Sequence, residues 1–287
     1  AAQGVSVIEI ARVGGHWQLV KDSRFNRRIT AETPMDIGGP ARGAALMRTQ
    51  ADPDGVRAFG TFGNCAGGET PWGTYLTAEE NIQDYFANLD QLKARSDVDP
   101  HIIESHRRWR MWKVNSLYAW EAVDARFDLP RTPTEPFRFG WIVEIDPRDP
   151  TRAPVKRTAL GRFAHEGASP FIAHNGRVAV YMGDDDKFEY IYKFVSDGRF
   201  DPKNPAANRD LLDRGTLYAA RLDASGRGQW LPLVFDPKGP LNAAAGFRDQ
   251  GEVLIKARAA ASLLGATPMD RTEDVEANPA TGRIYVA

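Results

Sequence analysis

The only cysteine of the chain, Cys65, lies in a glycine-rich stretch that runs into two adjacent glutamates, Glu79 and Glu80. Glycines tolerate positive φ angles and allow the backbone to approach a ligand closely. The segment 72–77 alternates in the way typical of a half-buried strand, which would deliver both glutamates at its exit. A thiol among carboxylates is a donor set that favours a transition metal such as iron. We therefore expect the segment 63–81 to contribute to a metal site.

Further acidic residues follow predicted strands or flank glycines elsewhere in the chain. In a β-propeller the corresponding strand ends point to one central funnel, where carboxylates from distant segments converge. Such a cluster would repel itself strongly without cations, and oxygen-rich clusters suit calcium. Most acids after strands are only solvated or cap turns, so this pattern does not by itself identify ligands. The acids considered are Glu79, Glu80, Glu166, Asp184, Asp185, Asp186, Glu273, Asp274 and Glu276.

Short alternating segments indicate the elements that would position these acids. Segments that open with a glycine at positions 140, 176 and 215 are apolar and alternating, and 282–287 starts in the same way. The first three openings lie roughly 40 residues apart, the interval typical of a four-stranded propeller blade. We therefore expect an all-β fold of the β-propeller class, with residues 1–287 forming one domain.

The segment 82–113 departs from the strand pattern, because its aromatic and leucine residues recur at helical spacing. It predicts a helical insertion in the β domain, and a second, alanine-rich helix is expected at 254–264. Residues 106–113 mix arginines with aromatic side chains, as nucleic-acid-binding segments do. However, 37 Lys and Arg against 38 Asp and Glu give a net charge of -1, which argues against nucleic acid. We expect Trp109 and Trp112 to pack inward and the arginines to face solvent.

Several classes of protein lack support in the sequence. No apolar run approaches the ~20 residues of a membrane span, and residues 1–4 lack the basic and apolar parts of a signal peptide. The five histidines form no zinc-peptidase motif. Neither a phosphate-binding Gly-x-x-x-x-Gly-Lys loop nor a Gly-x-Ser-x-Gly nucleophile turn is present, and the aspartates 184–186 lack the rest of an EF-hand loop.

The run Asn-Cys-Ala-Gly-Gly-x-Thr-Pro-Trp-Gly-Thr-aromatic-Leu-Thr-x-Glu-Glu-Asn at 64–81 resembles the signature of the PhoX family of alkaline phosphatases. The pattern is long and specific, and the similarity extends from about Gly4 to Ala287. Other matching segments are 26–30, 140–147, 165–168 and 270–274.

The resemblance implies a phosphoric monoester hydrolase that holds calcium together with ferric iron. It implies metal ligation by Cys65 and Glu80, and by further acids in the segments around 166, 184 and 273. Whether Asp184 or Asp185 is a ligand stays open at this point, and Glu79 is retained as a neighbour of Glu80. The candidate metal ligands are Cys65, Glu79, Glu80, Glu166, Asp184, Asp185 and Glu273.

Arg271 is the candidate catalytic residue outside the metal ligands. It precedes Glu273 by two positions, so on an extended segment both side chains would face the same side. Its planar guanidinium group suits the oxygens of a phosphate. Relatives commonly have proline between the two residues, and this chain has Thr272. The substitution leaves both functional groups in place.

The resemblance also implies the context of the site. The complete family fold would have six blades, and this chain would be an incomplete part that lacks strands at both ends. Family members are exported, which implies a periplasmic or secreted location, and the expected state is a monomer acting on a small phosphate ester.

Two alternatives remain open from the sequence. One is a metal-binding propeller module that has lost turnover, because a fold does not determine activity. The other is a calcium-dependent lactonase-like hydrolase, which would need neither Cys65 nor a phosphate-facing Arg271.

Overall fold

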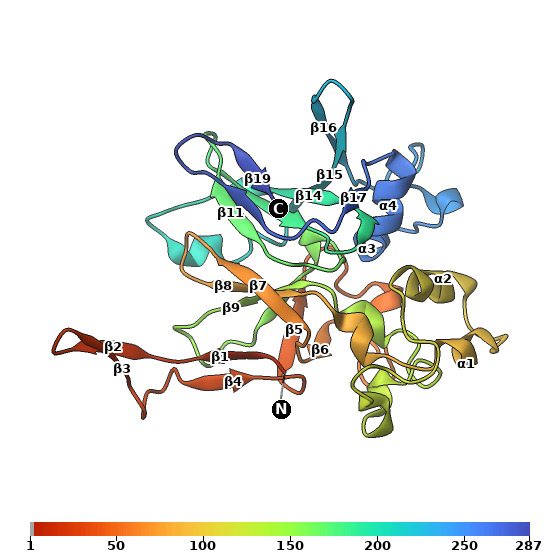
Figure 1. The fold of residues 1–287 in the computed structure, drawn as a ribbon, viewed down its shortest axis with the longest axis horizontal. Helices are drawn as coiled ribbons and strands as arrows, with labels where there is room; N and C mark the ends of the chain where they lie inside the picture. The colour runs from red at the N-terminus through yellow and green to blue at the C-terminus, as the bar shows by residue number, and fades with distance from the viewer. Residues whose placement is uncertain (1–2) are drawn as a thin grey trace.

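Short strands make up most of the regular structure in the computed structural model, which describes residues 3–287 (Figure 1). The strands are β1 (Val5–Val7), β2 (Ile10–Val13), β3 (His16–Leu19), β4 (Arg27–Ile29), β5 (Pro34–Gly38), β6 (Arg57–Phe59), β7 (Asn64–Glu69), β8 (Tyr75–Glu79), β9 (Ile142–Ile145), β10 (Val155–Arg157), β11 (Ser169–Ile172), β12 (Arg177–Gly183), β13 (Lys187–Glu189), β14 (Ile191–Arg199), β15 (Gly215–Leu222), β16 (Gly228–Pro232), β17 (Met269–Asp270), β18 (Val275–Ala277) and β19 (Ile284–Val286).

Helices are short, and most of them lie between β8 and β9 or between β16 and β17. The α-helices are α1 (Leu89–Lys93), α2 (Pro100–Arg108), α3 (Gln250–Ile255) and α4 (Ala257–Leu264). The 3-10 helices are η1 (Ala45–Met47), η2 (Ile82–Tyr85), η3 (Trp120–Ala122), η4 (Ala125–Phe127), η5 (Glu135–Arg138), η6 (Thr158–Leu160), η7 (Pro205–Asn208) and η8 (Ala243–Ala245).

Two larger sheets form the framework. One has six strands in the order β6-β5-β10-β9-β8-β7, and the other has five in the order β11-β12-β14-β15-β16. Neither sheet closes on itself among residues 3–287. The expectation of a mainly β fold is therefore confirmed. Within these two sheets, the central strands β8, β9, β12 and β14 carry most of the buried apolar side chains, because both of their faces are covered.

The interval of roughly 40 residues does not mark successive sheets throughout. The strands that begin near Gly176 and Gly215 are β12 and β15, and both flank β14 in the same five-stranded sheet. The expectation that each glycine opens a new blade is wrong at this point. Glycine turns also separate neighbouring strands of one antiparallel sheet, so this spacing has two structural origins.

Helical elements occupy the chain between β8 and β9 and continue past Lys113 to Arg138. Trp109 is buried there, but Trp112 is 41% exposed and donates a hydrogen bond to Asp84. Arg108 binds Glu189 with two N–H groups, at 2.9 and 2.8 Å. The expectation of an inward Trp112 is therefore wrong, because its indole N–H bonds Asp84 and its ring stays partly exposed. The expectation of solvent-facing arginines is wrong for Arg108, because it has a buried acidic partner.

The alanine-rich helix predicted at 254–264 is confirmed as α4, preceded by α3. Ala257, Ala260 and Ala261 are fully buried and belong to the apolar core of the five-stranded sheet. Small side chains let the helix lie close to the sheet, so the polar atoms that α4 carries are brought against the strand ends. None of the helices formed by residues 3–287 has the length and apolar character needed to cross a membrane.

The buried His106 of α2 predicts a dependence of stability on pH. Its ring contacts the carbonyl oxygen of Pro133 at 2.8 Å, and burial lowers its pKa from 6.5 to about 3. Between these pH values the unfolded chain binds one proton more than the folded chain at this site. We therefore expect the free energy of unfolding to fall as the pH falls, by up to about 1.4 kcal/mol per pH unit from this residue.

Urea denaturation of wild type and His106→Gln between about pH 4 and 7 measures this contribution. The variant should lose stability at neutral pH but show a shallower slope, whereas the exposed His16→Gln should keep the wild-type slope. Equal slopes in all three proteins would contradict the assignment.

Candidate metal centre

A bulge in β7 positions Cys65. In the antiparallel pair of β7 and β8, Asn64 lies opposite Glu79 and Gly67 lies opposite Thr77, so β7 has one residue more than β8 between these pairs. A bulge redirects the side chains of the extra residue and its neighbours, and bulges are frequent beside functional sites. Cys65 lies inside it and is exposed.

A glycine beside the bulge brings a second segment to Cys65. A Cβ atom at Gly68 would lie 1.8 Å from the carbonyl oxygen of Ala168. No side chain fits there, so only glycine allows β7 to lie against the segment that follows Glu166. Gly68 therefore permits contact between two backbone segments. The sequence had instead suggested that glycines of the motif allow contact with a ligand.

The segment 164–166 is held on both sides by backbone hydrogen bonds. The N–H of His165 donates to the carbonyl of Glu79 at 3.2 Å, and the N–H of Asp185 donates to the carbonyl of Ala164 at 3.0 Å. His165 also forms an isolated antiparallel bridge with Asp184. This arrangement places Glu166 between the end of β8 and the turn after β12.

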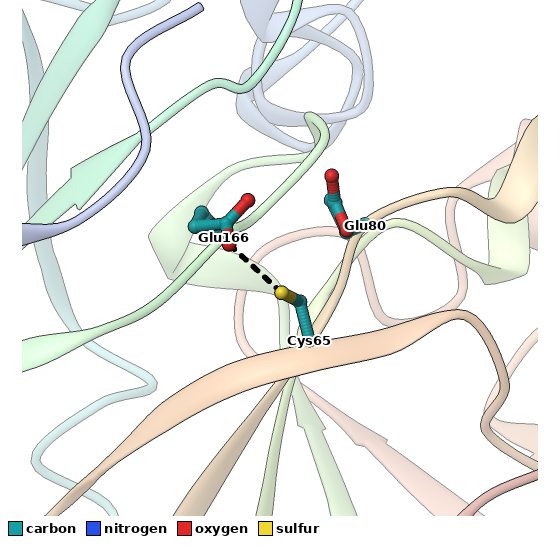
Figure 2. Close-up of side chains that lie close together, drawn as sticks. All are labelled: Cys65, Glu80 and Glu166. Atoms are coloured by element: carbon teal, nitrogen blue, oxygen red, sulfur yellow. Dashed lines mark hydrogen bonds between the residues drawn. The ribbon is translucent and has the colours of Figure 1, made fainter. Parts of the chain in front are cut away.

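Three predicted ligands come together as a result (Figure 2). One ligand atom each from Cys65, Glu80 and Glu166 lies within 4.8 Å of the others, and the thiol donates to Oε1 of Glu166 at 2.8 Å. Cys65 comes from β7, Glu80 from the residue after β8, and Glu166 from the loop before β11. We call this group the Cys65 cluster.

Protons are held tightly in the Cys65 cluster. Burial, the hydrogen bond to Glu166 and the charges of both glutamates raise the pKa of the Cys65 thiol to about 12. Burial, a hydrogen bond with Asp185 and the charge of Glu166 raise the pKa of Glu80 to about 8. The pKa of Glu166 is also raised, first by burial.

These shifts have one common cause, which is that three groups able to become anionic share a small, partly dehydrated space. A cation removes the repulsion and favours the deprotonated form of each ligand. One soft sulfur and two hard oxygens fit a transition metal better than calcium alone. The residues of the Cys65 cluster therefore fit a bound metal ion.

Glu79 is not part of the Cys65 cluster. It is fully buried and forms an ion pair with Lys156, which is also fully buried. Its Oε2 accepts hydrogen bonds from the backbone N–H groups of Gly140 and Trp141, at 2.9 and 3.1 Å. Neighbouring residues at a strand end point to opposite faces, so Glu79 and Glu80 have separate surroundings.

Asp184 and Asp185 are separated in the same way. Asp184 is fully buried and accepts two hydrogen bonds from Arg258 of α4, at 2.9 and 2.6 Å. Asp185 instead hydrogen-bonds with Glu80 and accepts a hydrogen bond from Nε of Arg271 at 3.0 Å. Of the two aspartates, Asp185 is therefore the one beside the Cys65 cluster.

Arg271 and Glu273 lie at the edge of this group. Gly183 allows their segment to approach β12, because a Cβ there would lie 2.5 Å from the carbonyl oxygen of Glu273. Nη2 of Arg271 is 2.9 Å from Oε1 of Glu273. The backbone of Arg271 has a φ of 58°, an unfavourable value for a residue with a side chain, and such strain is often found at functional sites.

A pocket of about 330 Å³ opens beside the Cys65 cluster, and we call it the front pocket. Glu80, Asp185 and Arg271 line it together with residues that were not among the candidate metal ligands or the candidate catalytic residue. Among these, Arg110 pairs with Asp186 at 3.0 Å, and Arg258 pairs with Asp184. The signal available in the sequence for Arg258 was that it is the only charged residue of the alanine-rich segment 257–264. The added lining residues are Asn81, Gln83, Trp109, Arg110, Ala164, Asp186 and Arg258.

Two comparisons with known proteins found a match. The model of the family described as alkaline phosphatase PhoX matches residues 1–287. A solved structure of Pseudomonas fluorescens PhoX in complex with vanadate, a transition state analogue, is 49% identical and has a TM-score of 0.91. The match covers 99% of this chain and 49% of that chain, so this chain spans about half the length of that protein. Among curated proteins, a search found no match.

The ion pair between Glu79 and Lys156 predicts a large effect on stability. Replacing Lys156 with methionine leaves the Glu79 carboxylate buried without its cation, which typically costs about 3–5 kcal/mol. The double variant Glu79→Gln, Lys156→Met removes both charges and should recover a large part of that loss. Urea denaturation of the single and double variants measures both values. A loss below about 1 kcal/mol in Lys156→Met would contradict a structural role for this pair.

Proposed function

Because this chain belongs to the PhoX family of alkaline phosphatases, we propose that it carries the metal centre of a metal-dependent phosphomonoesterase. One observation supports this most directly: the Cys65 cluster borders the front pocket, which an arginine also lines. Cations would be held on one side and a phosphate group could enter on the other. The chain spans about half of the related enzyme, so turnover by this chain is part of the proposal.

In this proposal Cys65, Glu80 and Glu166 hold metal directly, and Asp185 and Glu273 complete the set. Asp185 is supported by its hydrogen bond with Glu80 and its place in the front pocket. Glu273 is supported by its electrostatic effect on Glu166. The mixed donor set is compatible with ferric iron at the thiolate and calcium at the carboxylates.

Glu79 and Asp184, both considered as ligands from the sequence, receive a different role in the proposal. Each is fully buried and already neutralised by a basic side chain. Glu79 fixes the end of β8 from which Glu80 extends, and Asp184 fixes the turn that carries Asp185. They orient the ligands and do not contact the metal.

Arg271 is proposed to bind the phosphate oxygens of the substrate. Its guanidinium group lies in the front pocket with half of the side chain exposed, so a ligand can reach it. Two parallel N–H groups match two oxygens of a phosphoryl group. Bound metal ions would supply charge neutralisation at the remaining phosphoryl oxygens. Arg271 would then stabilise the charge that develops during phosphoryl transfer.

For the architecture, we propose that the two larger sheets belong to an incomplete β-propeller of one domain, residues 1–287. The complete family fold would have six blades, and the helical stretch from 82 to 113 would be an insertion. A periplasmic or secreted location, a monomeric state and a small phosphate ester as substrate are further parts of the proposal. They are supported by the family resemblance.

Elemental analysis of the purified chain tests the metal ligands, with turnover of p-nitrophenyl phosphate recorded on the same samples. We expect iron and calcium in wild type, and loss of both iron and turnover in Cys65→Ala. Glu166→Gln should bind less metal, whereas Glu104→Gln should match wild type because its side chain is 72% exposed on α2. Wild type without iron would contradict the proposed centre, and metal without turnover would favour the inactive module.

Replacement of Arg271 by glutamine separates phosphate binding from metal binding. We expect kcat/KM to fall by about 10²- to 10³-fold while the metal content stays at the wild-type level, because loss of one stabilising donor has effects of this size. A panel of phosphate esters and lactones measures this for both substrate classes. Lactone turnover that does not depend on Arg271 would favour the lactonase-like alternative.

A further inference from the structure

A second pocket lies behind the front pocket, between α2 and the pair α3 and α4. Its volume is about 180 Å³, and basic residues line much of it. We call it the rear pocket. Trp109 and Arg258 line both pockets, so they form a shared wall. The basic residues of the rear pocket are His101, Arg108, Arg162, Lys256 and Arg258.

Most of these cations have an acidic partner. Arg108 binds Glu189 and Arg258 binds Asp184, each at hydrogen-bonding distance. Lys256 lies 3.4 Å from Glu252. Among the described residues, a single carboxylate lines the rear pocket, that of Glu104, and it is largely exposed and pairs with Arg107 outside the pocket.

Arg162 differs, because it has no acidic partner among the described residues. Its side chain is fully buried, Nε and Nη2 donate to the carbonyls of Phe139 and Pro136, and Nη1 has no hydrogen-bond partner in residues 3–287. Burial and the charge of Arg258 lower its pKa. The one acid that opposes this shift, Glu79, is already paired with Lys156.

A buried guanidinium group without a counter-ion is costly, and a buried N–H without an acceptor adds to the cost. Trp109 offsets part of it, because the guanidinium groups of Arg162 and Arg258 lie 4.2 and 4.3 Å from its ring centre. Two cations share that one ring, and neither gains a negative charge from it.

We propose that the rear pocket binds a small oxyanion of the size and charge of inorganic phosphate, with Arg162 as its principal partner. The volume is several times the roughly 30 Å³ that a water molecule occupies in the liquid, and lies below the range of about 300–1,000 Å³ typical of larger ligands. Lys256, whose side chain is 13% exposed, would provide a second cation at the edge. This site is separate from Arg271 and does not depend on the proposed turnover.

Isothermal titration calorimetry with inorganic phosphate at constant ionic strength tests the proposal on the purified, metal-loaded chain. We expect a phosphate-binding event that survives in Arg271→Gln, which removes the arginine of the front pocket. The dissociation constant of that event should rise at least about tenfold in Arg162→Gln, because a hydrogen bond to a charged group is lost. Arg57→Gln is the matched control, because its side chain is 75% exposed and does not line the rear pocket.

The proposal is overturned if Arg271→Gln abolishes all phosphate binding, if Arg162→Gln binds as wild type does, or if wild type binds no phosphate. Sulfate, titrated in the same way, should compete if the site recognises tetrahedral oxyanions in general. Should Arg162→Gln fail to fold, judged by circular dichroism, Lys256→Gln provides the test. A several-fold weaker phosphate affinity in that variant supports the site, and an unchanged affinity overturns it.

Discussion

Repulsion between carboxylates that converge from separate segments is the constraint on which the rest of this structure depends. The chain offsets this repulsion differently for carboxylates that are fully buried and for those that are not. The fully buried Glu79 and Asp184 each have a basic side chain in contact, namely Lys156 and Arg258. Among residues 3–287, Glu80 and Glu166 have no such cation, and their pKa values are raised. The acids left without a cation of the protein are therefore the ones that a metal ion would stabilise most.

Two glycines and one β-bulge allow these segments to converge. Gly68 admits the segment of Glu166, and Gly183 admits the segment of Arg271 and Glu273. The bulge at Cys65 turns the thiol toward the place where these segments meet. Each device acts between segments far apart in the chain, so a larger residue at either glycine would separate the ligands without altering any of them.

The sequence predicts the members of the site better than their individual roles. The motif around Cys65 is contiguous, so local pattern is sufficient to predict the strand that ends at Glu79 and the position of Glu80 directly after it. The distinction between Glu79 and Glu80 depends on which face of β8 meets Lys156, and that residue lies on β10, in another part of the chain. The distinction between Asp184 and Asp185 depends in the same way on Arg258 of α4. Local periodicity carries no information about such distant partners. The spacing of the glycines also did not distinguish strands of one sheet from strands of successive sheets.

The shared wall of Trp109 and Arg258 connects the charges of the two pockets. Arg258 binds Asp184, the neighbour of Asp185, and also lines the rear pocket, while Arg162 contacts the same ring of Trp109. Cations at the centre and an oxyanion in the rear pocket have opposite signs, so each would lower the electrostatic cost of the other across a poorly screened interior. Coupling between two binding sites is reciprocal by thermodynamic necessity. An anion in the rear pocket would therefore strengthen metal binding by the same factor by which the metals strengthen anion binding, with no movement of the backbone required.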